Sequence, residues 1–203
     1  MKVGGGRVVG SAGKVGEVRE RMSERLILDA AKDLFYVRGF TAVGVNDLGA
    51  AVGVSGPAIY RHFSSKAEIL TTLFDEAMDR LLELAGPPLD DPRENLLALA
   101  RTHAEFALRD RALVSVYMRE ERSLSDAERT RLRRRQRAFV DRWVRALERC
   151  APGRSPDEIE ASAHALIGML LSAAHWPASV RGNMAYADLL VDLVDGAATR
   201  LAT

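Results

Sequence analysis

The sequence has a single cysteine, Cys150, among 203 residues. One cysteine excludes a disulfide framework and a four-thiolate zinc site, and it indicates a reducing, cytoplasmic setting. The sequence also has no run of about 18 apolar residues, so we expect no membrane span. Residues 1–16 have no apolar core of the kind that a secretory signal requires.

Net charge is nearly absent as well. The chain has 29 Lys and Arg against 28 Asp and Glu, a formal charge of +1. This balance excludes a protein that coats polyanions without specificity. It conceals an asymmetry, because residues 1–66 hold 10 basic and 6 acidic residues whereas residues 67–203 hold 19 and 22. A basic front part is expected if that part meets a phosphate backbone.

Signatures of catalysis and of metal binding are also missing. There is no P-loop, no H-E-x-x-H and no G-x-S-x-G, and the glycine-rich start of the chain follows no strand. His103, His164 and His175 show no metal-ligand spacing with one another or with Cys150. We therefore expect no enzyme, no cofactor and no metal, and we keep a helical enzyme only as a remote alternative.

The hydrophobic pattern is helical nearly everywhere, and no segment alternates like a strand. The pattern predicts an all-α chain of about nine helices. Residues 1–21 contain six glycines and predict a flexible tail, which could alternatively act as a basic arm in the minor groove. The expected helices span residues 24–37, 45–52, 56–62, 66–85, 92–109, 111–119, 126–150, 156–176 and 184–201.

The most specific segment is VNDLGAAVGVSGPAIYRHF, from Val45 to Phe63. Gly49 is small enough for a second helix to cross the first closely, and Gly53 permits a sharp turn with positive φ. Ser55 is expected to cap the second helix through its side chain. The segment predicts two short helices that meet at a tight turn.

Two aliphatic residues complete this pattern. Val54 is expected to fill the corner and Ile59 to point into the core. An ordinary helical corner would explain a lone Gly-Val-Ser, but all these spacings together are typical of a helix-turn-helix that binds DNA.

The stretch GF…VNDLGAAVGVSGPAIYRHFSSKAEIL resembles the signature of the tetracycline-repressor (TetR) family of bacterial regulators. The match runs from the first helix through Gly39-Phe40 to Lys66 and Leu70. The remaining chain is similar to the family only in length and helicity. The resemblance implies a helix-turn-helix domain of three helices over residues 22–66 and a helical bundle for ligand binding and dimerisation over residues 67–203.

The family resemblance implies a homodimer that binds a palindromic operator in double-stranded DNA and is released by a small-molecule effector, apolar or amphipathic. We expect a repressor, although nothing in the sequence separates a repressor from an activator. A regulator that binds DNA constitutively, without a ligand, is the alternative.

The resemblance also assigns DNA contacts to individual residues. Tyr60, His62 and Lys66 match positions that contact the DNA backbone, and Arg61 could bind a phosphate or read guanine. Members usually carry Thr or Ser before the first short helix, where this chain has Val43-Gly44, so backbone N–H groups would have to serve there. The implied DNA-binding residues are Gly44, Ser55, Gly56, Pro57, Ala58, Tyr60, Arg61, His62 and Lys66.

Large aromatic and methionine side chains on the later helices are candidates for a ligand pocket, although each one alone is more simply a core residue. They are Phe74, Met78, Phe106, Tyr117, Met118, Phe139, Trp143, Met169 and Trp176. A dense arginine run follows on one helix: Arg129, Arg131, Arg133, Arg134, Arg135 and Arg137. The simplest reading of this run is a solvated face paired with neighbouring acids; a site for a phosphate-bearing ligand such as an acyl-CoA, or a second nucleic-acid contact, stays open.

The last two long helices carry more apolar and small residues than a single surface helix needs. Helices rich in small residues can approach closely, so these two could meet their symmetry mates in a four-helix bundle. Burial inside one subunit is the alternative. The candidate dimer residues are Ala161, Ala165, Gly168, Tyr186, Leu189, Leu190, Leu193 and Val194.

Overall fold

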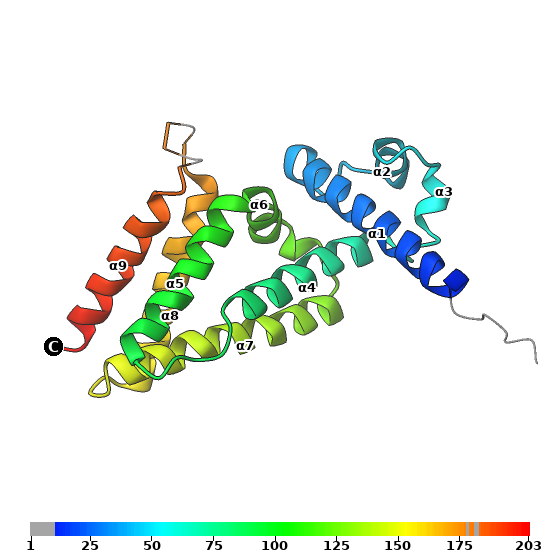
Figure 1. The fold of residues 1–203 in the computed structure, drawn as a ribbon. Helices are drawn as coiled ribbons and strands as arrows, with labels where there is room; N and C mark the ends of the chain where they lie inside the picture. The colour runs from blue at the N-terminus through cyan, green and yellow to red at the C-terminus, as the bar shows by residue number, and fades with distance from the viewer. Residues whose placement is uncertain (1–10, 178, 181–182) are drawn as a thin grey trace, which may run out of the picture. The chain divides into compact units, whose positions relative to one another are not determined.

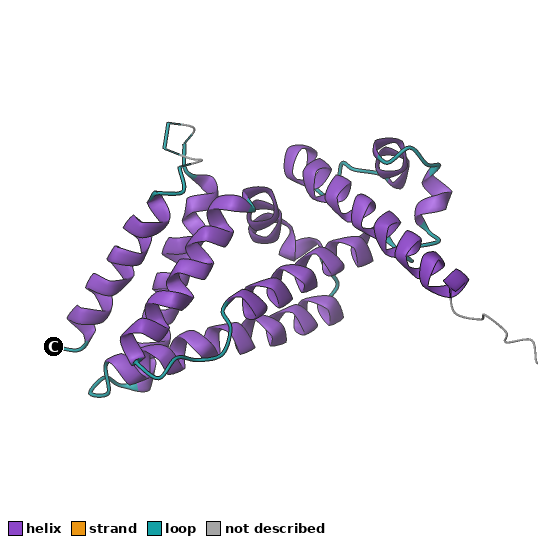
Figure 2. Ribbon diagram, in the orientation of Figure 1, coloured by secondary structure: helices purple, strands orange, loops and turns teal. Residues whose placement is uncertain are grey.

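The computed structural model describes residues 11–177, 179–180 and 183–203, and every regular element in this part is helical (Figure 2). The α-helices are α1 Ser11–Arg38, α2 Val45–Ala51, α3 Gly56–Ile59, α4 Lys66–Leu84, α5 Pro92–Arg109, α6 Arg111–Glu120, α7 Asp126–Cys150, α8 Pro156–Ser172 and α9 Tyr186–Leu201 (Figure 1). Two short 3-10 helices, Glu121–Ser123 and Ala173–His175, follow α6 and α8. The prediction of an all-α fold is confirmed.

The start of the first helix differs from the prediction. α1 begins at Ser11, not near residue 24, so it includes residues 11–21 of the predicted tail; residues 1–10 lie outside the described part. Extending an existing helix adds one hydrogen bond for each residue that is fixed, and a glycine costs only about 1 kcal/mol. The good helix formers between Gly16 and Ser23 are therefore enough to carry the helix backward.

The chain divides into two compact units, with the division between Leu70 and Thr71. The predicted boundary after residue 66 lies earlier, at the first residue of α4. The first turn of α4 belongs with the first unit, where Ile69 and Leu70 are fully buried.

The core of the first unit is built by one face of α1 together with α2 and α3. Ala31 and Phe35 of α1 are fully buried, as is Leu48 of α2. The Phe35 and Phe40 rings meet edge to face, with centroids 5.2 Å apart. Gly39, at φ 82°, follows the last residue of α1 in the left-handed conformation that often ends a helix.

The second unit is organised around α5, which packs against α7, α8 and α9. Side-chain caps start three of these helices at the predicted positions: Asp91, Ser125 and Ser155 each accept a hydrogen bond from the backbone N–H three residues later. α8 ends at Ser172, earlier than predicted, because the chain tightens into 3-10 geometry before Pro177. Among the described helices, none is both long and apolar enough to cross a bilayer.

Candidate functional site

The turn between α2 and α3 has the geometry that its glycines predict. Gly53 has φ +74°, in the left-handed region that favours glycine. A Cβ on Gly49 would lie 2.7 Å from the Val54 carbonyl oxygen and 2.9 Å from the Gly56 nitrogen. Because those neighbours are backbone atoms, only glycine allows α2 to approach the start of α3 this closely.

Two aliphatic residues near the turn, Val54 and Ile59, were both predicted to be buried, and the structure confirms only one of these predictions. Ile59 is 1% exposed and points into the core, as expected. Val54 is 44% exposed and does not fill the corner. The Val54 N–H instead donates to the Gly49 carbonyl at 2.9 Å, so the backbone closes the corner and the side chain is left outside.

Ser55 occupies the cap position of α3, but its side chain forms no cap hydrogen bond. A cap side chain usually accepts from the second or third N–H of its helix. Here the second helical residue is Pro57, which has no N–H, and the third, Ala58, donates to the Ser55 carbonyl at 2.9 Å. The prediction of a side-chain cap is therefore wrong, and the exposed Ser55 hydroxyl is not engaged in capping.

At the start of α2, the Gly44 N–H donates to Asp47 Oδ2 at 2.7 Å. Arg38 also contacts Asp47, at 3.0 Å. The Gly44 hydrogen bond, and then the one from Arg38, hold the pKa of Asp47 below its usual value. The Gly44 N–H expected to face a phosphate is thus already engaged inside the protein.

The predicted DNA-binding residues of α3 and the following turn differ in accessibility. Ser55, Pro57, Tyr60 and Arg61 are exposed, and Tyr60 exposes 52% of its surface. Ala58 is half-buried. The helical hydrogen bonds end earlier than predicted, at Ile59, and tighter i to i−3 bonds continue the turn to His62.

Gly56 is buried, unlike its neighbours in the candidate surface. A Cβ at this position would lie 3.2 Å from the Asn46 Cα and overlap the Asn46 side chain. The structure therefore gives Gly56 a packing role between α2 and α3 rather than an exposed position.

Lys66 lies half-buried at the start of α4 with its ammonium group turned inward. Nζ donates to the Phe40 carbonyl at 2.7 Å and to the Val43 carbonyl at 2.8 Å. These bonds connect the segment after α1 to α4. They differ from the predicted contact of Lys66 with the DNA backbone, which remains a prediction.

His62 is half-buried and also faces the protein. Its Nδ1 has no hydrogen-bond partner and lies 4.0 Å from Glu24 Oε1, on α1. Glu20 brings a further carboxylate within 4.8 Å of this group. Groups of exposed acids often assemble without an ion, so we assign no metal here, and the predicted phosphate contact of His62 is untested.

The second unit contains a cavity of about 840 Å³ between α4, α5, α6, α7 and α8. Its buried walls are apolar except at one position, and they include Met78 and Leu81 of α4 and Phe106 of α5. Toward solvent the lining becomes polar, with Arg133, Arg137 and Asp141 on α7 and Glu160 and His164 on α8. The cavity thus has an apolar interior and a rim of mixed charge.

Four of the predicted pocket residues line this cavity: Met78, Phe106, Tyr117 and Phe139. The other five do not, because each lies on a part of its helix that does not border the cavity. Phe74 and Trp143 are fully buried in the core, whereas Met118 is 53% exposed. Trp176 packs edge to face against Tyr186, and Met169 is half-buried on another part of α8.

The sequence prediction missed His103, which lines the cavity and is 2% exposed. Burial lowers its pKa to about 4, so the imidazole is neutral at pH 7. Its ring lies edge-on to Phe139 and Trp143, with centroids 5.2 and 6.0 Å away. The sequence does carry a signal for this residue, since His103 interrupts the apolar face of α5 that includes Leu99 and Phe106.

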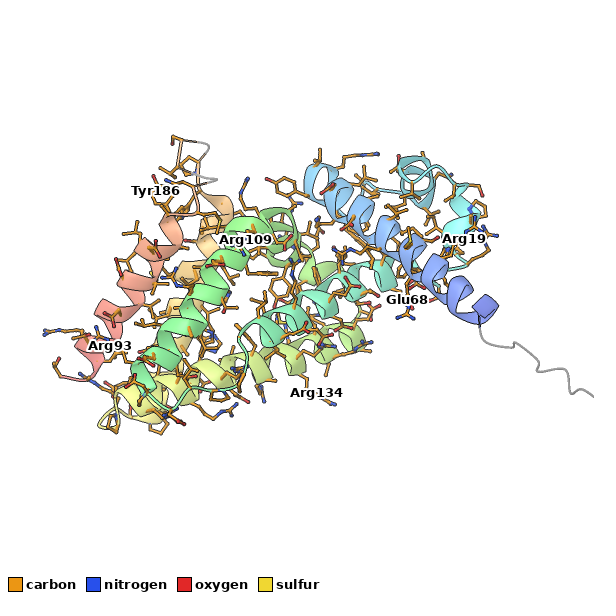
Figure 3. The ribbon with its side chains drawn as sticks, viewed as in Figure 1. Arg19, Glu68, Arg93, Arg109, Arg134 and Tyr186 are labelled. Carbon is orange, nitrogen blue, oxygen red and sulfur yellow. The ribbon has the colours of Figure 1, made fainter. Side chains whose placement is uncertain are left out.

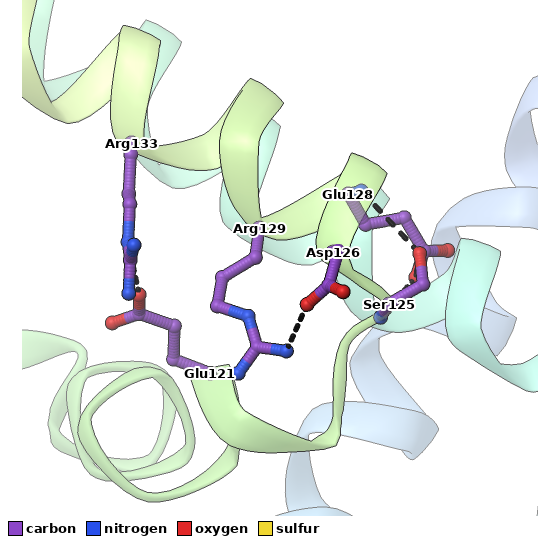
Figure 4. A network of polar contacts seen from close by, with 6 residues as sticks. All are labelled: Glu121, Ser125, Asp126, Glu128, Arg129 and Arg133. Atoms are coloured by element: carbon purple, nitrogen blue, oxygen red, sulfur yellow. Dashed lines mark hydrogen bonds and ion pairs between the residues drawn. The ribbon is translucent and has the colours of Figure 1, made fainter.

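The arginine run largely forms ion pairs. Arg129 pairs with Asp126 at 2.9 Å and Arg133 with Glu121 at 3.4 Å, beside the Ser125–Glu128 capping box (Figure 4). Arg131 and Arg135 both pair with Asp75 of α4, and Arg135 also pairs with Asp79. Arg134 and Arg137 are exposed; Arg134 is labelled on α7 in Figure 3. The partners are thus partly those predicted, and α4 supplies two that the sequence pattern did not indicate.

The candidate dimer residues fall into two groups. Leu190 and Val194 are buried within the subunit, at 1% and 0%, and Tyr186 is half-buried. The exposed ones are Ala161, Ala165, Gly168, Leu189 and Leu193, and the two leucines expose 47% and 50%. A Cβ on Gly168 would meet nothing within 4 Å. α8 and α9 therefore each expose an apolar or small-residue stripe.

Family models match both units. The model described as "Bacterial regulatory proteins, tetR family" matches residues 27–73. The model described as "Tetracyclin repressor-like, C-terminal domain" matches residues 89–197, which is more than half of the chain.

Individual proteins are similar over shorter stretches. The HTH-type transcriptional repressor KstR2 of Rhodococcus jostii is 33% identical over 127 residues, or 60% of this chain and 62% of that one. The HTH-type transcriptional activator FasR of Mycolicibacterium smegmatis is 33% identical over 94 residues, or 45% of this chain and 42% of that one. The chain thus matches less than two thirds of the length of either relative.

A crystal structure of AibR in complex with isovaleryl coenzyme A and operator DNA has the same fold. Its TM-score is 0.73 at 21% identity, covering 86% of this chain and 96% of that chain. At this identity the similarity establishes the fold alone.

Proposed function

The chain belongs to the TetR family of bacterial regulatory proteins, and on that premise we propose that it binds a palindromic operator as a homodimer and releases it when a small molecule occupies the cavity. The observation that carries the proposal is the pairing of a helix-turn-helix in one unit with a large, mainly apolar cavity in the other.

The DNA-binding surface is formed by the exposed side of α3 and the turn after it. Tyr60 and Arg61 present a hydroxyl and a guanidinium, which are suitable donors for phosphate oxygens or base edges. Pro57 and Ala58 provide only apolar contact. Base reading by so few donors implies that DNA shape contributes to operator choice.

A palindromic operator requires two copies of α3 in successive major grooves, which a homodimer supplies, and the proposed dimer interface lies on α8 and α9. The exposed stripe of Ala161, Ala165 and Gly168 would allow close helix packing, and Leu189 and Leu193 would be covered. Burial of Leu190 and Val194 within the subunit restricts the proposed interface to the exposed residues of the two helices.

The effector is an apolar or amphipathic molecule that fits the cavity. α4 offers a route for its effect, because Ala77, Met78 and Leu81 line the cavity while Lys66, at the start of the same helix, bonds to the segment after α1. A ligand changes operator affinity only if it binds the two conformations of α4 unequally. The AibR complex supports this assignment, since that protein takes isovaleryl coenzyme A in the same fold.

An open cavity disfavours a constitutive regulator, which would be expected to have a fully packed bundle. The relatives named above include a repressor and an activator, so they do not decide between repression and activation. We propose repression. In vitro transcription from the protein's own promoter measures that sign directly.

A binding assay tests the DNA-binding surface. Fluorescence anisotropy would be measured with the DNA upstream of the protein's own gene, for the wild type and for Arg61→Ala and Tyr60→Ala. Each variant should bind at least tenfold more weakly, which corresponds to about 1.4 kcal/mol. Arg134→Ala is the matched control, because it removes an exposed arginine from α7. Wild-type affinity of Arg61→Ala together with weakened Arg134→Ala would locate the DNA contact on the arginine run instead.

A further inference from the structure

The polar groups of the cavity are unevenly distributed between its rim and its interior. The charged lining residues Arg133, Arg137, Asp141 and Glu160 are exposed, and Glu121 is paired with Arg133. Tyr117 accepts a hydrogen bond from Gln136, so both of these polar residues have a partner within the wall. Among the buried residues that line the described cavity, His103 is the only one with a polar side chain.

The His103 imidazole lacks the internal partners that buried polar groups normally have. Its Nδ1 is buried without a hydrogen-bond partner, and so is Nε1 of the adjacent Trp143. Two of the three unpaired, buried side-chain nitrogens in the described residues therefore belong to neighbouring side chains, His103 on the cavity wall and Trp143 in the adjacent core. No bond to Nδ1 fixes the tautomer, so the other ring nitrogen, Nε2, can either accept from a hydroxyl or donate to a carbonyl.

The surroundings of His103 also determine which ligand groups can reach it. The nearest rings belong to Phe139 and Trp143, and desolvation keeps the imidazole neutral at pH 7. A carboxylate or phosphate brought to this wall would lose its hydration without meeting an opposite charge. A hydroxyl or carbonyl would exchange one hydrogen bond with water for one with His103.

We propose that His103 is the specificity-determining residue of the cavity, selecting ligands whose buried end carries an uncharged hydroxyl or carbonyl group. This inference rests on the proposed function, because it takes the cavity as the effector site. The ligand then has an apolar body with one hydrogen-bonding group at His103, and any charged group stays at the rim, near Arg137.

Three series of fatty-acid probes, each covering 8–16 carbons, test the proposal without an identified effector. Every probe carries a carboxylate at one end. The opposite end is a methyl group in the first series, a hydroxyl group in the second and another carboxylate in the third. Calorimetric titration of the full chain gives each affinity, and the range of lengths ensures that some chains reach His103. The wild type should bind the hydroxy acids at least as tightly as the methyl-ended acids, and the diacids at least tenfold more weakly.

Variants assign the hydroxyl preference to His103. In His103→Leu, the ratio of hydroxy-acid to methyl-acid affinity should fall about tenfold. His103→Gln keeps a hydrogen-bonding side chain and should retain most of the preference. His175→Leu, which changes an exposed histidine that does not line the cavity, is the matched control and should leave the ratio unchanged.

The outcomes separate this proposal from the function on which it rests. If the fatty acids bind but His103→Leu does not alter the ratio of hydroxy-acid to methyl-acid affinity, the role of His103 is overturned. The cavity then remains an effector site. Diacids that bind as well as the hydroxy acids would overturn the exclusion of charge. If no chain binds to the wild type, the effector cavity itself is refuted, and His103 has no ligand to select.

Discussion

The Lys66 ammonium donates a 2.7 Å hydrogen bond to the Phe40 carbonyl and lies 4.3 Å from the centre of the Phe40 ring. Lys66 begins α4, and Phe40 follows α1, so one side chain connects the two ends of the helix-turn-helix segment. A charged donor to a half-buried carbonyl contributes more than a neutral one.

Replacing Lys66 by methionine should therefore lower stability rather than remove a DNA contact. We expect the free energy of unfolding to fall by about 1–3 kcal/mol, because two half-buried carbonyls lose a charged donor. Urea denaturation measures this change. Among molecules that remain folded, the slope of log affinity for DNA against log salt should stay at its wild-type value.

Arg61→Met is the control for that measurement. It should leave stability unchanged and reduce the salt slope by about 1 if Arg61 contacts a phosphate. A reduced slope in Lys66→Met would show that Lys66 contacts the DNA backbone after all.

Gly49→Ala should disrupt the crossing of α2 and α3. The new Cβ would stand 2.7 Å from a backbone oxygen and 2.9 Å from a backbone nitrogen, so the helices must separate. Overpacking of this kind costs about 1–3 kcal/mol, and operator affinity should fall with it. Gly153→Ala is the control, because nothing lies within 4 Å of its added Cβ. A stable, DNA-binding Gly49→Ala variant would contradict the close approach.

Asp75→Asn should loosen the contact of α4 with α7. Asp75 is 16% exposed and receives both Arg131 and Arg135, so its charge is better shielded from water than that of a surface pair. We expect a loss of about 1 kcal/mol in the free energy of unfolding. Asp126→Asn breaks a pair with Arg129 in which the aspartate is fully exposed to solvent, and it should have no measurable effect. If the two variants lose equal stability in thermal denaturation, the shielding of Asp75 from water does not strengthen its ion pairs.

His103 should make stability depend on pH. Its pKa is lowered from 6.5 to about 4 by burial, so between these values the unfolded chain binds more protons than the folded one. Stability therefore falls as pH decreases from 6.5 toward 4, by roughly 3 kcal/mol from this residue. His103→Leu should raise the melting temperature and flatten this part of the profile, as thermal melts from pH 4 to 7 would show. An unchanged profile would mean that His103 is not desolvated.

Leu189→Glu combined with Leu193→Glu should produce a monomer. These leucines expose 47% and 50% of their surface in the single chain, and a dimer through α9 would bury the introduced charges. Leu84→Glu alters a leucine that is 58% exposed on α4 and should not change the mass. Native mass spectrometry distinguishes the species. A dimeric double variant would place the interface elsewhere.

The helix-turn-helix was predictable because its determinants are local. Gly49, Gly53 and Ile59 act within a few residues of their own position, through backbone conformation and helix spacing. The starts of α5, α7 and α8 were equally readable, since a cap and its partner lie three residues apart. The start of α1 could not be read from the sequence in this way. A segment with weak helix propensity can extend a stable helix without a capping residue of its own.

The sequence by itself determined the helical fold, the turn between α2 and α3 and the family, since all of these follow from residues close together in the chain. Tertiary structure decided which side chains face inward. It turned Lys66 onto the Phe40 and Val43 carbonyls, paired Arg131 with Asp75 from another helix and placed His103 on a cavity wall. Periodicity gives the face of a helix on which a residue lies, but what that face meets depends on segments far away in the sequence.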